Sequence, residues 1–306
     1  MPFKLNPHFF DSMHLDAAES IFYAGQLETV SAGVYEERFA EYDWRTLIPT
    51  RLLAPGEDDI KYRRYTGVGV AQFIVAYADD LPRVDLAGAE TIVSAKDIGD
   101  SYGVSLKEVR RAAMVGTNVS AAKAIMARRA MEQKLQQVAE TGSPERGLYG
   151  LINQPNVTIA AAGGTWATRT PAQIVADVNA LVQGMRDDTK RIESPTDLLL
   201  PDAQYTLLAT TPYQAGLETT ILDFILKTNR YLRNITAWDS LKGAGAGGTN
   251  RIVAYRKAPD VLEGLVREFE ELGPQVRNLE TVTNCIAATG GVIVSLPMAV
   301  RYMDGV

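Results

Sequence analysis

Short runs of apolar and β-branched residues separated by glycine and proline turns occur between residues 47 and 77. Residues 47–53 (LIPTRLL), 60–66 (IKYRRYT) and 68–77 (VGVAQFIVAY) have this pattern, which is typical of β-strands. Pro55 and Gly56, within the turn APGEDD, predict a hairpin between the first two strands. Because a ribbon of two or three strands is marginally stable in water, we expect this one to pack on another surface, such as a neighbouring subunit.

One face of this predicted ribbon is apolar. The alternation places Ile60, Tyr62, Phe73 and Val75 there, with few local partners. We therefore expect these side chains to be exposed in a single copy and to be covered by the next one.

Residues 1–45 precede the ribbon and mix acids with short apolar groups. They offer one short helix, near Ser12 to Gln26, and no longer periodic pattern. This composition predicts an arm that needs another surface to lie on.

Two consecutive helices follow the ribbon. Ser105 and Glu108 have the spacing of a capping box, which predicts a helix over 106–115 that ends at Gly116. A second helix is predicted over 118–141, where nearly all residues are strong helix formers, and Gly142 ends it. The small apolar residues of the second helix spread around its axis, so we expect it to contact partners on several sides.

The remaining chain alternates between helices and strands. We predict helices over 171–186 and 219–227, and strands over 197–200 (DLLL), 251–255 (RIVAY), 281–296 and 298–303. The glycine-rich loop SLKGAGAGGTN, residues 240–250, precedes RIVAY. We expect its segment Gly243–Gly248 to be mobile, because repeated glycine without an anchoring side chain is costly to order.

Charge is distributed unevenly. The chain carries 31 Lys and Arg against 37 Asp and Glu, a net charge of −6. Residues 106–138 alone hold seven bases and two acids, a net charge of +5, so the rest of the chain carries −11. Two interpretations stay open: a solvated helical face, or a surface that faces polyphosphate. The seven bases are Lys107, Arg110, Arg111, Lys123, Arg128, Arg129 and Lys134.

Known catalytic and metal-binding patterns are missing from the 306 residues. The soft ligands are His8, His14 and Cys285, which are far apart in sequence and predict no zinc site and no internal disulfide. Gly243, Gly245 and Gly248 match G-x-G-x-x-G, but a strand follows them where a dinucleotide site needs a helix. We therefore expect no catalytic residues, no cofactor, no metal and no enzyme activity.

Paired acids occur three times, at Asp58-Asp59, Asp79-Asp80 and Asp187-Asp188. Such pairs can perform acid–base chemistry or hold Mg²⁺. Each pair lies in a turn-like context with bases nearby, so we favour ion pairing at the surface.

Targeting and membrane signals are also missing. The N-terminus has no basic start followed by an apolar stretch, which predicts a protein that works in a cytoplasm. The longest uncharged run, 281–300, contains Asn284, two glycines and Pro297, and is too broken to span a membrane.

Five segments in this order are similar to the major capsid proteins of tailed bacteriophages, which have the Hong Kong 97-type fold. They are RTLIPTR (45–51), IKYRRYTGVGVAQFI (60–74), YADDLPRVD (77–85), SLKEVRRAAMVGTNVSAAKAIMARRAMEQ (105–133) and GLYGLIN (147–153). The resemblance covers essentially the whole chain. It implies an α+β fold with an N-terminal arm, an extended loop, a peripheral domain with a long spine helix, and an axial domain.

The resemblance also implies where these parts lie. The N-terminal arm would be 1–45, the extended loop 46–92, the peripheral domain 93–157 with its spine helix at 118–141, and the axial domain 158–261. Residues 262–306 would return as strands of the peripheral domain. We expect no fused scaffolding segment before the arm, and hence a separate scaffolding protein.

The function implied is that of a structural coat protein, assembled in the cytoplasm of a bacterial host and resident in the virion. Hexamers and pentamers of the chain would form an icosahedral shell around double-stranded DNA, held by non-specific contacts, with portal, scaffolding or decoration proteins as further partners and no membrane. Two alternatives stay open. Encapsulin shells, which enclose a cargo enzyme, share the helix–Gly–helix and the glycine turn of 105–153, and a soluble α/β enzyme with an unrecognised site is the more remote alternative.

Overall fold

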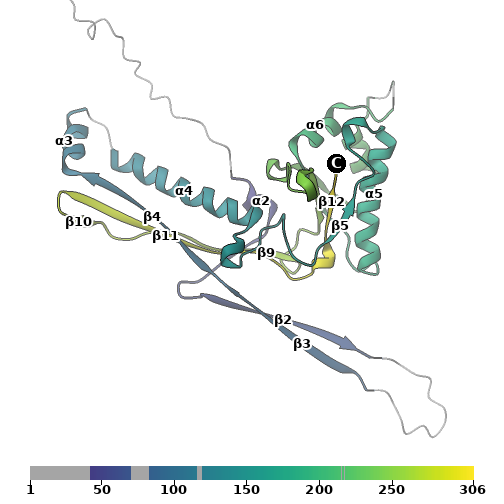
Figure 1. Cartoon of the computed structure of the whole chain (residues 1–306), viewed down its shortest axis with the longest axis horizontal. Coiled ribbons are helices and arrows are strands. Elements are labelled where there is room, and N and C mark those ends of the chain that lie inside the picture. The colour runs from purple at the N-terminus through teal and green to yellow at the C-terminus, as the bar shows by residue number, and fades with distance from the viewer. Residues whose placement is uncertain (1–41, 70–82, 116–118, 215, 217) are drawn as a thin grey trace, which may run out of the picture. The chain divides into compact units, whose positions relative to one another are not determined.

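The computed structural model describes residues 42–69, 83–115, 119–214, 216 and 218–306 (Figure 1). The predicted arm up to residue 41, its helix, and both histidines lie outside these residues, as does most of the predicted strand 68–77. Tyr42–Val306 cluster as one compact unit.

The first sheet combines strands that are distant in sequence. Its order is β1 (Thr50–Leu52), β9 (Leu262–Glu271), β11 (Glu280–Val294) and β10 (Gln275–Arg277), and β4 (Lys96–Ser105) also pairs with β11. β1 runs parallel to β9, with Thr50 opposite Gly264. The predicted hairpin of 47–53 with 60–66 is therefore wrong: Pro55 and Gly56 form a turn, but the strands on either side of it join different sheets.

The second of the two predicted helices lies along this sheet. α3 (Leu106–Val115) follows β4 directly, and α4 (Val119–Thr141) contacts β4, β11 and β9 (Figure 1). Both predicted helices are confirmed within one residue at the described ends. Gly142 has a φ of 73°, the left-handed conformation expected where a helix ends.

A two-stranded ribbon emerges beside the first sheet. β2 (Asp59–Val68) and β3 (Asp85–Ser94) pair antiparallel over ten residue pairs, from Asp59 opposite Ser94 to Val68 opposite Asp85. The ribbon predicted from the sequence exists, but the partner of β2 is β3, which the alternation pattern did not reveal.

The second sheet has the order β5 (Thr158–Ala161), β12 (Val300–Asp304), β8 (Arg251–Tyr255), β6 (Asp197–Leu200) and β7 (Asn234–Ala237). Three helices accompany it: α5 (Pro171–Asp188), α6 (Asp202–Thr210) and α7 (Ile221–Thr228). Of these elements, α5, β6, α7 and β8 confirm the predictions, whereas β5, α6 and β7 were not foreseen. β12 pairs with β5 and β8, so the last strand does not join β9 and β11 in the first sheet.

Strand alternation divides the interior into two clusters. Leu199, Val253, Tyr255 and Tyr302 point to one side of the second sheet, where they pack with Leu135 of α4 and other residues of that cluster. The residues between them in sequence, including Leu198, Leu200, Ile252 and Met303, pack with α5 and α7 on the other side. Both faces are covered, which explains why DLLL and RIVAY are buried over their whole length and apolar apart from Asp197 and Arg251.

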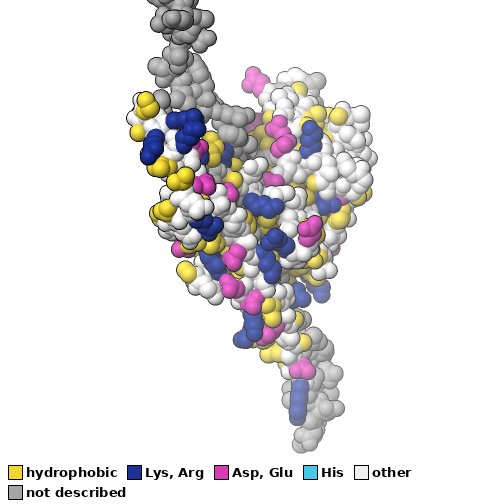
Figure 2. All heavy atoms as spheres, turned by 60° about the vertical axis from the view of Figure 1, so that its left-hand side comes forward, with side chains coloured by type: hydrophobic (Ala, Val, Ile, Leu, Met, Phe, Trp, Pro, Cys, Tyr) yellow, Lys and Arg dark blue, Asp and Glu magenta, His cyan; other side chains and the backbone are white. Residues whose placement is uncertain are grey.

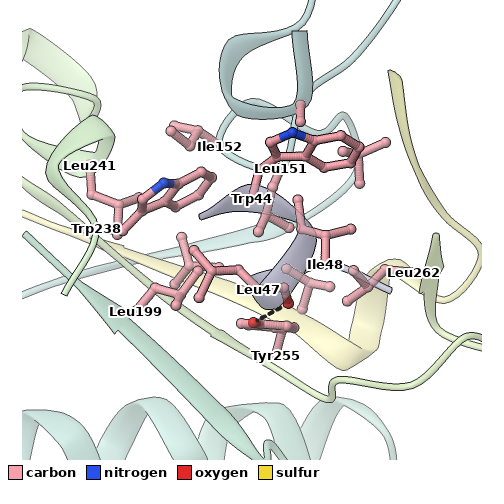
Figure 3. Close-up of a cluster of buried hydrophobic side chains, with 14 of the residues drawn as sticks. Trp44, Leu47, Ile48, Leu151, Ile152, Leu199, Trp238, Leu241, Tyr255 and Leu262 are labelled. Atoms are coloured by element: carbon pink, nitrogen blue, oxygen red, sulfur yellow. Dashed lines mark hydrogen bonds between the residues drawn. The ribbon is translucent and has the colours of Figure 1, made fainter. Parts of the chain in front are cut away.

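A short helix, α2 (Trp44–Leu47), fills the first cluster (Figure 3). Trp44 and Leu47 are buried there, and the hydroxyl of Tyr255 donates to the carbonyl of Leu47 at 2.7 Å. Burial raises the pKa of Tyr255 far above its ordinary value, so this hydroxyl stays a donor. The start of the described chain is thus fastened to the second sheet.

Candidate assembly surfaces

The ribbon is anchored at one end and exposed along the rest. Ile60 is buried with Leu53 and Leu265 where the ribbon meets the first sheet, and Tyr62 packs partly against them. The expectation that Ile60 is exposed is therefore wrong, and Phe73 and Val75 lie outside the described residues. Further along the ladder, Tyr65 is 69% and Leu86 is 68% exposed, so apolar area beyond the anchor remains uncovered in a single copy.

α3 carries a second uncovered apolar surface. Leu106, Val109 and Met114 are 44%, 51% and 89% exposed, and Val276 and Leu279 are exposed beside the start of the helix, where Leu106 N–H bonds to Leu279 O. The predicted capping box is present: Glu108 N–H donates to Ser105 Oγ at 3.2 Å, and Ser105 N–H donates to Glu108 Oε2 at 3.0 Å. The bond from Ser105 N–H to the carboxylate, together with the bond from Lys123, lowers the pKa of Glu108.

Residues 106–138, the positive segment, contain seven bases with different surroundings. Lys123 Nζ binds Glu108 and the carbonyl of Gly103, and the guanidinium of Arg128 lies over the ring of Phe269, so both already have partners within the chain. Among the described residues, Lys107, Arg110 and Arg111 have no ion-pair partner. Figure 2 shows Lys and Arg side chains gathered at the height of α3. Three bases of this segment without an ion-pair partner thus lie together on α3.

Charge is mixed on the first sheet. Arg267 of β9 pairs with Asp97 of β4 and with Asp58. Asp100 and Glu271 lie opposite the buried Cys285 of β11. The sheet itself therefore does not separate bases from acids.

The glycine-rich loop is held by side chains at its ends. Asp304 Oδ2 accepts from Ala246 N–H at 2.9 Å, and Asn250 Oδ1 accepts from Gly243 N–H at 3.1 Å. Gly243, Gly247 and Gly248 have φ values of 68°, 68° and 79°, which only glycine adopts without strain. The premise that no side chain anchors this loop is wrong.

Asp304 has a second partner below the loop. Arg251 donates to both of its carboxylate oxygens, at 2.6 and 2.7 Å, and also to the carbonyl of Ile152 at 2.7 Å. Burial alone would raise the pKa of Asp304, but the bonds from Arg251 and Ala246 hold it below its usual 3.8. One buried ion pair thus connects the loop, the second sheet and the segment after α4.

Three glycines, Gly142, Gly150 and Gly291, meet at the GLYGLIN turn. A Cβ on Gly150 would collide with the carbonyl of Glu140, and one on Gly142 with the carbonyl of Leu148. A Cβ on Gly291, in β11, would lie 2.6 Å from the carbonyl of Tyr149. The end of α4, the following turn and β11 therefore approach more closely than any other residue type permits.

A groove of about 700 Å³ lies between the base of the ribbon, the turn after α4 and the end of β11. Its lining includes the exposed Ile92 and Tyr149 and the bases Arg64, Lys96 and Arg146. None of these three bases has an ion-pair partner among the described residues, whereas the nearby Arg63 is paired with Glu90 at 2.9 Å.

The paired acids form ion pairs where they are described, but with other partners than their sequence neighbours. Asp58 pairs with Arg267 at 3.0 Å, and Asp188 pairs with Arg301. Asp79 and Asp80 lie outside the described residues. In the described ranges no three His, Cys, Asp or Glu side chains are arranged to hold a metal ion, and no helix there has the length and apolarity to cross a membrane.

The model of the family described as "Major capsid protein" matches residues 69–306. The chain belongs to the major capsid protein family. It is a structural protein of a capsid shell, its place is in the virion, and the family builds homo-oligomeric capsomers. A family of structural shell proteins points to a protein that is not an enzyme.

Solved structures give the same fold for this major capsid protein. The capsid of Myoviridae phage XM1 matches with a TM-score of 0.84 at 15% identity, covering 94% of this chain and 100% of that chain. A structure from Mycobacterium phage Ogopogo matches with a TM-score of 0.61 at 12% identity, covering 93% of this chain and 99% of that chain. A virus-like particle from Pyrococcus furiosus matches with a TM-score of 0.51 at 15% identity, covering 84% and 89%. A search of curated protein sequences finds no match.

Proposed function

We propose that this major capsid protein assembles, in the cytoplasm of a bacterial host, into hexamers and pentamers that close an icosahedral shell around double-stranded DNA. The carrying observation is the group of bases on α3. Lys107, Arg110 and Arg111 follow one another on this helix and have no ion-pair partner among the described residues. Phosphate of a packaged duplex would meet these bases, through contacts that are weak singly and large in sum over the shell.

The parts of the chain have separate roles in this proposal. Residues 1–45 are the arm, 46–92 the extended loop, 93–157 the peripheral domain with α4 as its spine, 158–261 the axial domain, and 262–306 the returning strands, of which β12 joins the sheet of the axial domain. The ribbon β2–β3 is the core of the extended loop and packs on an adjacent subunit, because its apolar side chains beyond Tyr62 have no cover of their own.

Heterologous contacts of this kind close into rings, and several weak contacts per subunit reinforce one another. Portal, scaffolding and decoration proteins are the further partners.

The test of the proposal is electron microscopy of the purified chain after co-expression with its own packaging machinery. We expect closed shells whose DNA resists nuclease. Shells that hold a co-purifying enzyme and no DNA would contradict the DNA part of the proposal, and a chain that forms no large particle would contradict the proposal as a whole.

A shortened ribbon tests the subunit contact. Thr91 lies opposite Tyr62 in the ladder, so an Asn-Gly turn that joins them replaces residues 63–90 and keeps the buried anchor at Ile60. We expect a folded, soluble chain that does not close shells. Shells of normal yield from this variant would rule out the ribbon as an assembly contact.

A further inference from the structure

A hollow of about 600 Å³ lies between α5 and the turn that follows α7. Asn179 and Gln183, one helical turn apart on α5, form one side of it, and Thr228, Arg230 and Tyr231 form the other. The lining contains no acid and a single base. It therefore suits neither a metal ion, which needs carboxylate ligands, nor a polyanion, which needs several bases.

Several hydrogen-bonding groups of the hollow have no partner. The side chains of Asn179, Thr228 and Arg230 make no hydrogen bond or ion pair with any described residue. Gln183 donates from Nε2 to Asp187 at 2.8 Å, which leaves its Oε1 as a free acceptor. The hollow thus offers donors and acceptors together. A ligand hydroxyl group needs both, because it donates one hydrogen bond and accepts others.

Tyr231 adds an aromatic ring that is held in place before any ligand binds. The guanidinium of Arg186 lies over the ring, 4.2 Å from its centroid, and Asn229 Oδ1 accepts from Tyr231 N–H at 3.0 Å. The next residue, Leu232, is buried and anchors the turn. Tyr231 nevertheless stays 39% exposed. A ring fixed in this way loses little side-chain entropy when a flat apolar surface stacks on it.

We infer that this hollow binds a neutral pyranose sugar, whose C–H face stacks on Tyr231 and whose hydroxyl groups bond to Asn179, Gln183 and Arg230. A pyranose combines the two properties that the hollow matches, a flat apolar face and a rim of hydroxyl groups. A purely apolar ligand would instead cover the polar groups and leave them unpaired, which is unfavourable. The site is separate from the proposed DNA contact, because none of its residues belongs to α3.

Saturation-transfer difference NMR on the purified full-length chain tests the site. The probes are methyl glucoside, methyl galactoside, methyl mannoside and N-acetylglucosamine. At least one probe should receive saturation on its ring C–H protons, with a Kd of about 1 mM, because an open hollow with a few neutral hydrogen bonds gives modest affinity. Absence of binding for all four probes at about 30 mM would overturn the inference and leave the proposed function standing.

Substitutions in the hollow locate the bound sugar. Tyr231→Ala should raise the Kd about tenfold, since the stacking surface is lost, whereas Tyr231→Phe should stay within about twofold of the unchanged chain. Asn179→Ala, at an exposed position of α5, should raise the Kd about fivefold through the loss of one hydrogen bond. Thermal unfolding by circular dichroism verifies that each variant is folded, and Asn179→Ala carries the test if Tyr231→Ala does not fold.

Tyr149→Ala is the matched control. Its ring is exposed to a similar extent, 46%, but lies in the groove beside the ribbon, so its removal should leave the Kd unchanged. Folded Tyr231→Ala or Asn179→Ala that binds like the unchanged chain would overturn the inference. Loss of binding in Tyr149→Ala alone would place the sugar in the groove and would overturn it as well.

Discussion

Arg251 of β8 and Asp304 of β12 form a buried, two-bonded ion pair directly beneath the glycine-rich loop. The pair satisfies the Ala246 N–H of the loop and the Ile152 carbonyl of the turn after α4 at the same time. Two side chains thus link the glycine-rich loop, strands β8 and β12 and the turn after the spine helix.

Asp304→Asn should lower the free energy of unfolding by about 3 kcal/mol at neutral pH, because it leaves the Arg251 charge buried without its partner. The folded carboxyl has a pKa below 3.8, so the pair contributes fully at higher pH and its contribution is lost as the pH falls through the folded pKa. The difference in melting temperature between the two proteins should be constant from pH 8 to about 5 and shrink below about pH 4. A difference that grows on acidification would contradict this assignment.

Gly150→Ala should destabilise the fold by about 3 kcal/mol or more, since its Cβ would collide with the rigid carbonyl of Glu140. Gly147→Ala is the matched control in the same turn. Its φ is 70° but open space surrounds it, so the cost is limited to backbone strain of about 1 kcal/mol. Denaturant unfolding of the two variants measures the difference, and equal costs would show that the three-glycine junction is not close-packed.

Tyr255→Phe should cost about 1 kcal/mol, because the Leu47 carbonyl loses its buried donor while the ring still fills the cluster. Thermal unfolding monitored by the fluorescence of Trp44 and its neighbours measures this change. Tyr65→Phe, on the exposed ribbon, serves as the control and should leave the melting temperature unchanged.

DNA contact should depend on α3 more than on α4. Replacing Lys107, Arg110 and Arg111 by glutamine should lower the temperature at which filled particles release DNA, most clearly at low salt, where phosphate contacts are strongest. Lys123→Gln breaks the bonds to Glu108 and Gly103 and should weaken the packing of α3 on α4 in empty and filled shells alike. If the triple variant instead fails to form empty shells, these bases serve contacts between subunits.

Sequence periodicity predicted the elements whose pattern is local. The helix of residues 118–141 and the strands DLLL and RIVAY were identified because composition, capping and burial on both faces leave signals within a few residues. Strand partners leave no such signal. β1 finds β9 more than two hundred residues later, and nothing in LIPTRLL distinguishes that partner from the nearby IKYRRYT.

The candidate surfaces could be predicted only in part, because contacts between residues distant in sequence leave no local signal. The positive segment was visible in the sequence. The ion pair of Lys123 with Glu108 and the contact of Arg128 with the Phe269 ring depend on how α3 and β9 pack against α4. β3 escaped prediction because DLAGAETIVS is rich in small and acidic residues, which are poor strand formers, and only the long ladder with β2 fixes its conformation. The anchor of the glycine loop, Asp304, is more than fifty residues away in sequence.

The β2–β3 ribbon exposes a free copy of the chain to aggregation before assembly begins. Within the described strands each pairs with the other alone, so both outer edges present unpaired backbone N–H and C=O groups to any passing strand. A newly made copy is therefore exposed to edge-to-edge aggregation for as long as it waits for a neighbour. Lys61, Arg63 and Arg64, with Glu90 opposite, keep the ribbon charged and soluble before assembly. Rapid incorporation into a growing shell then ends the risk of aggregation.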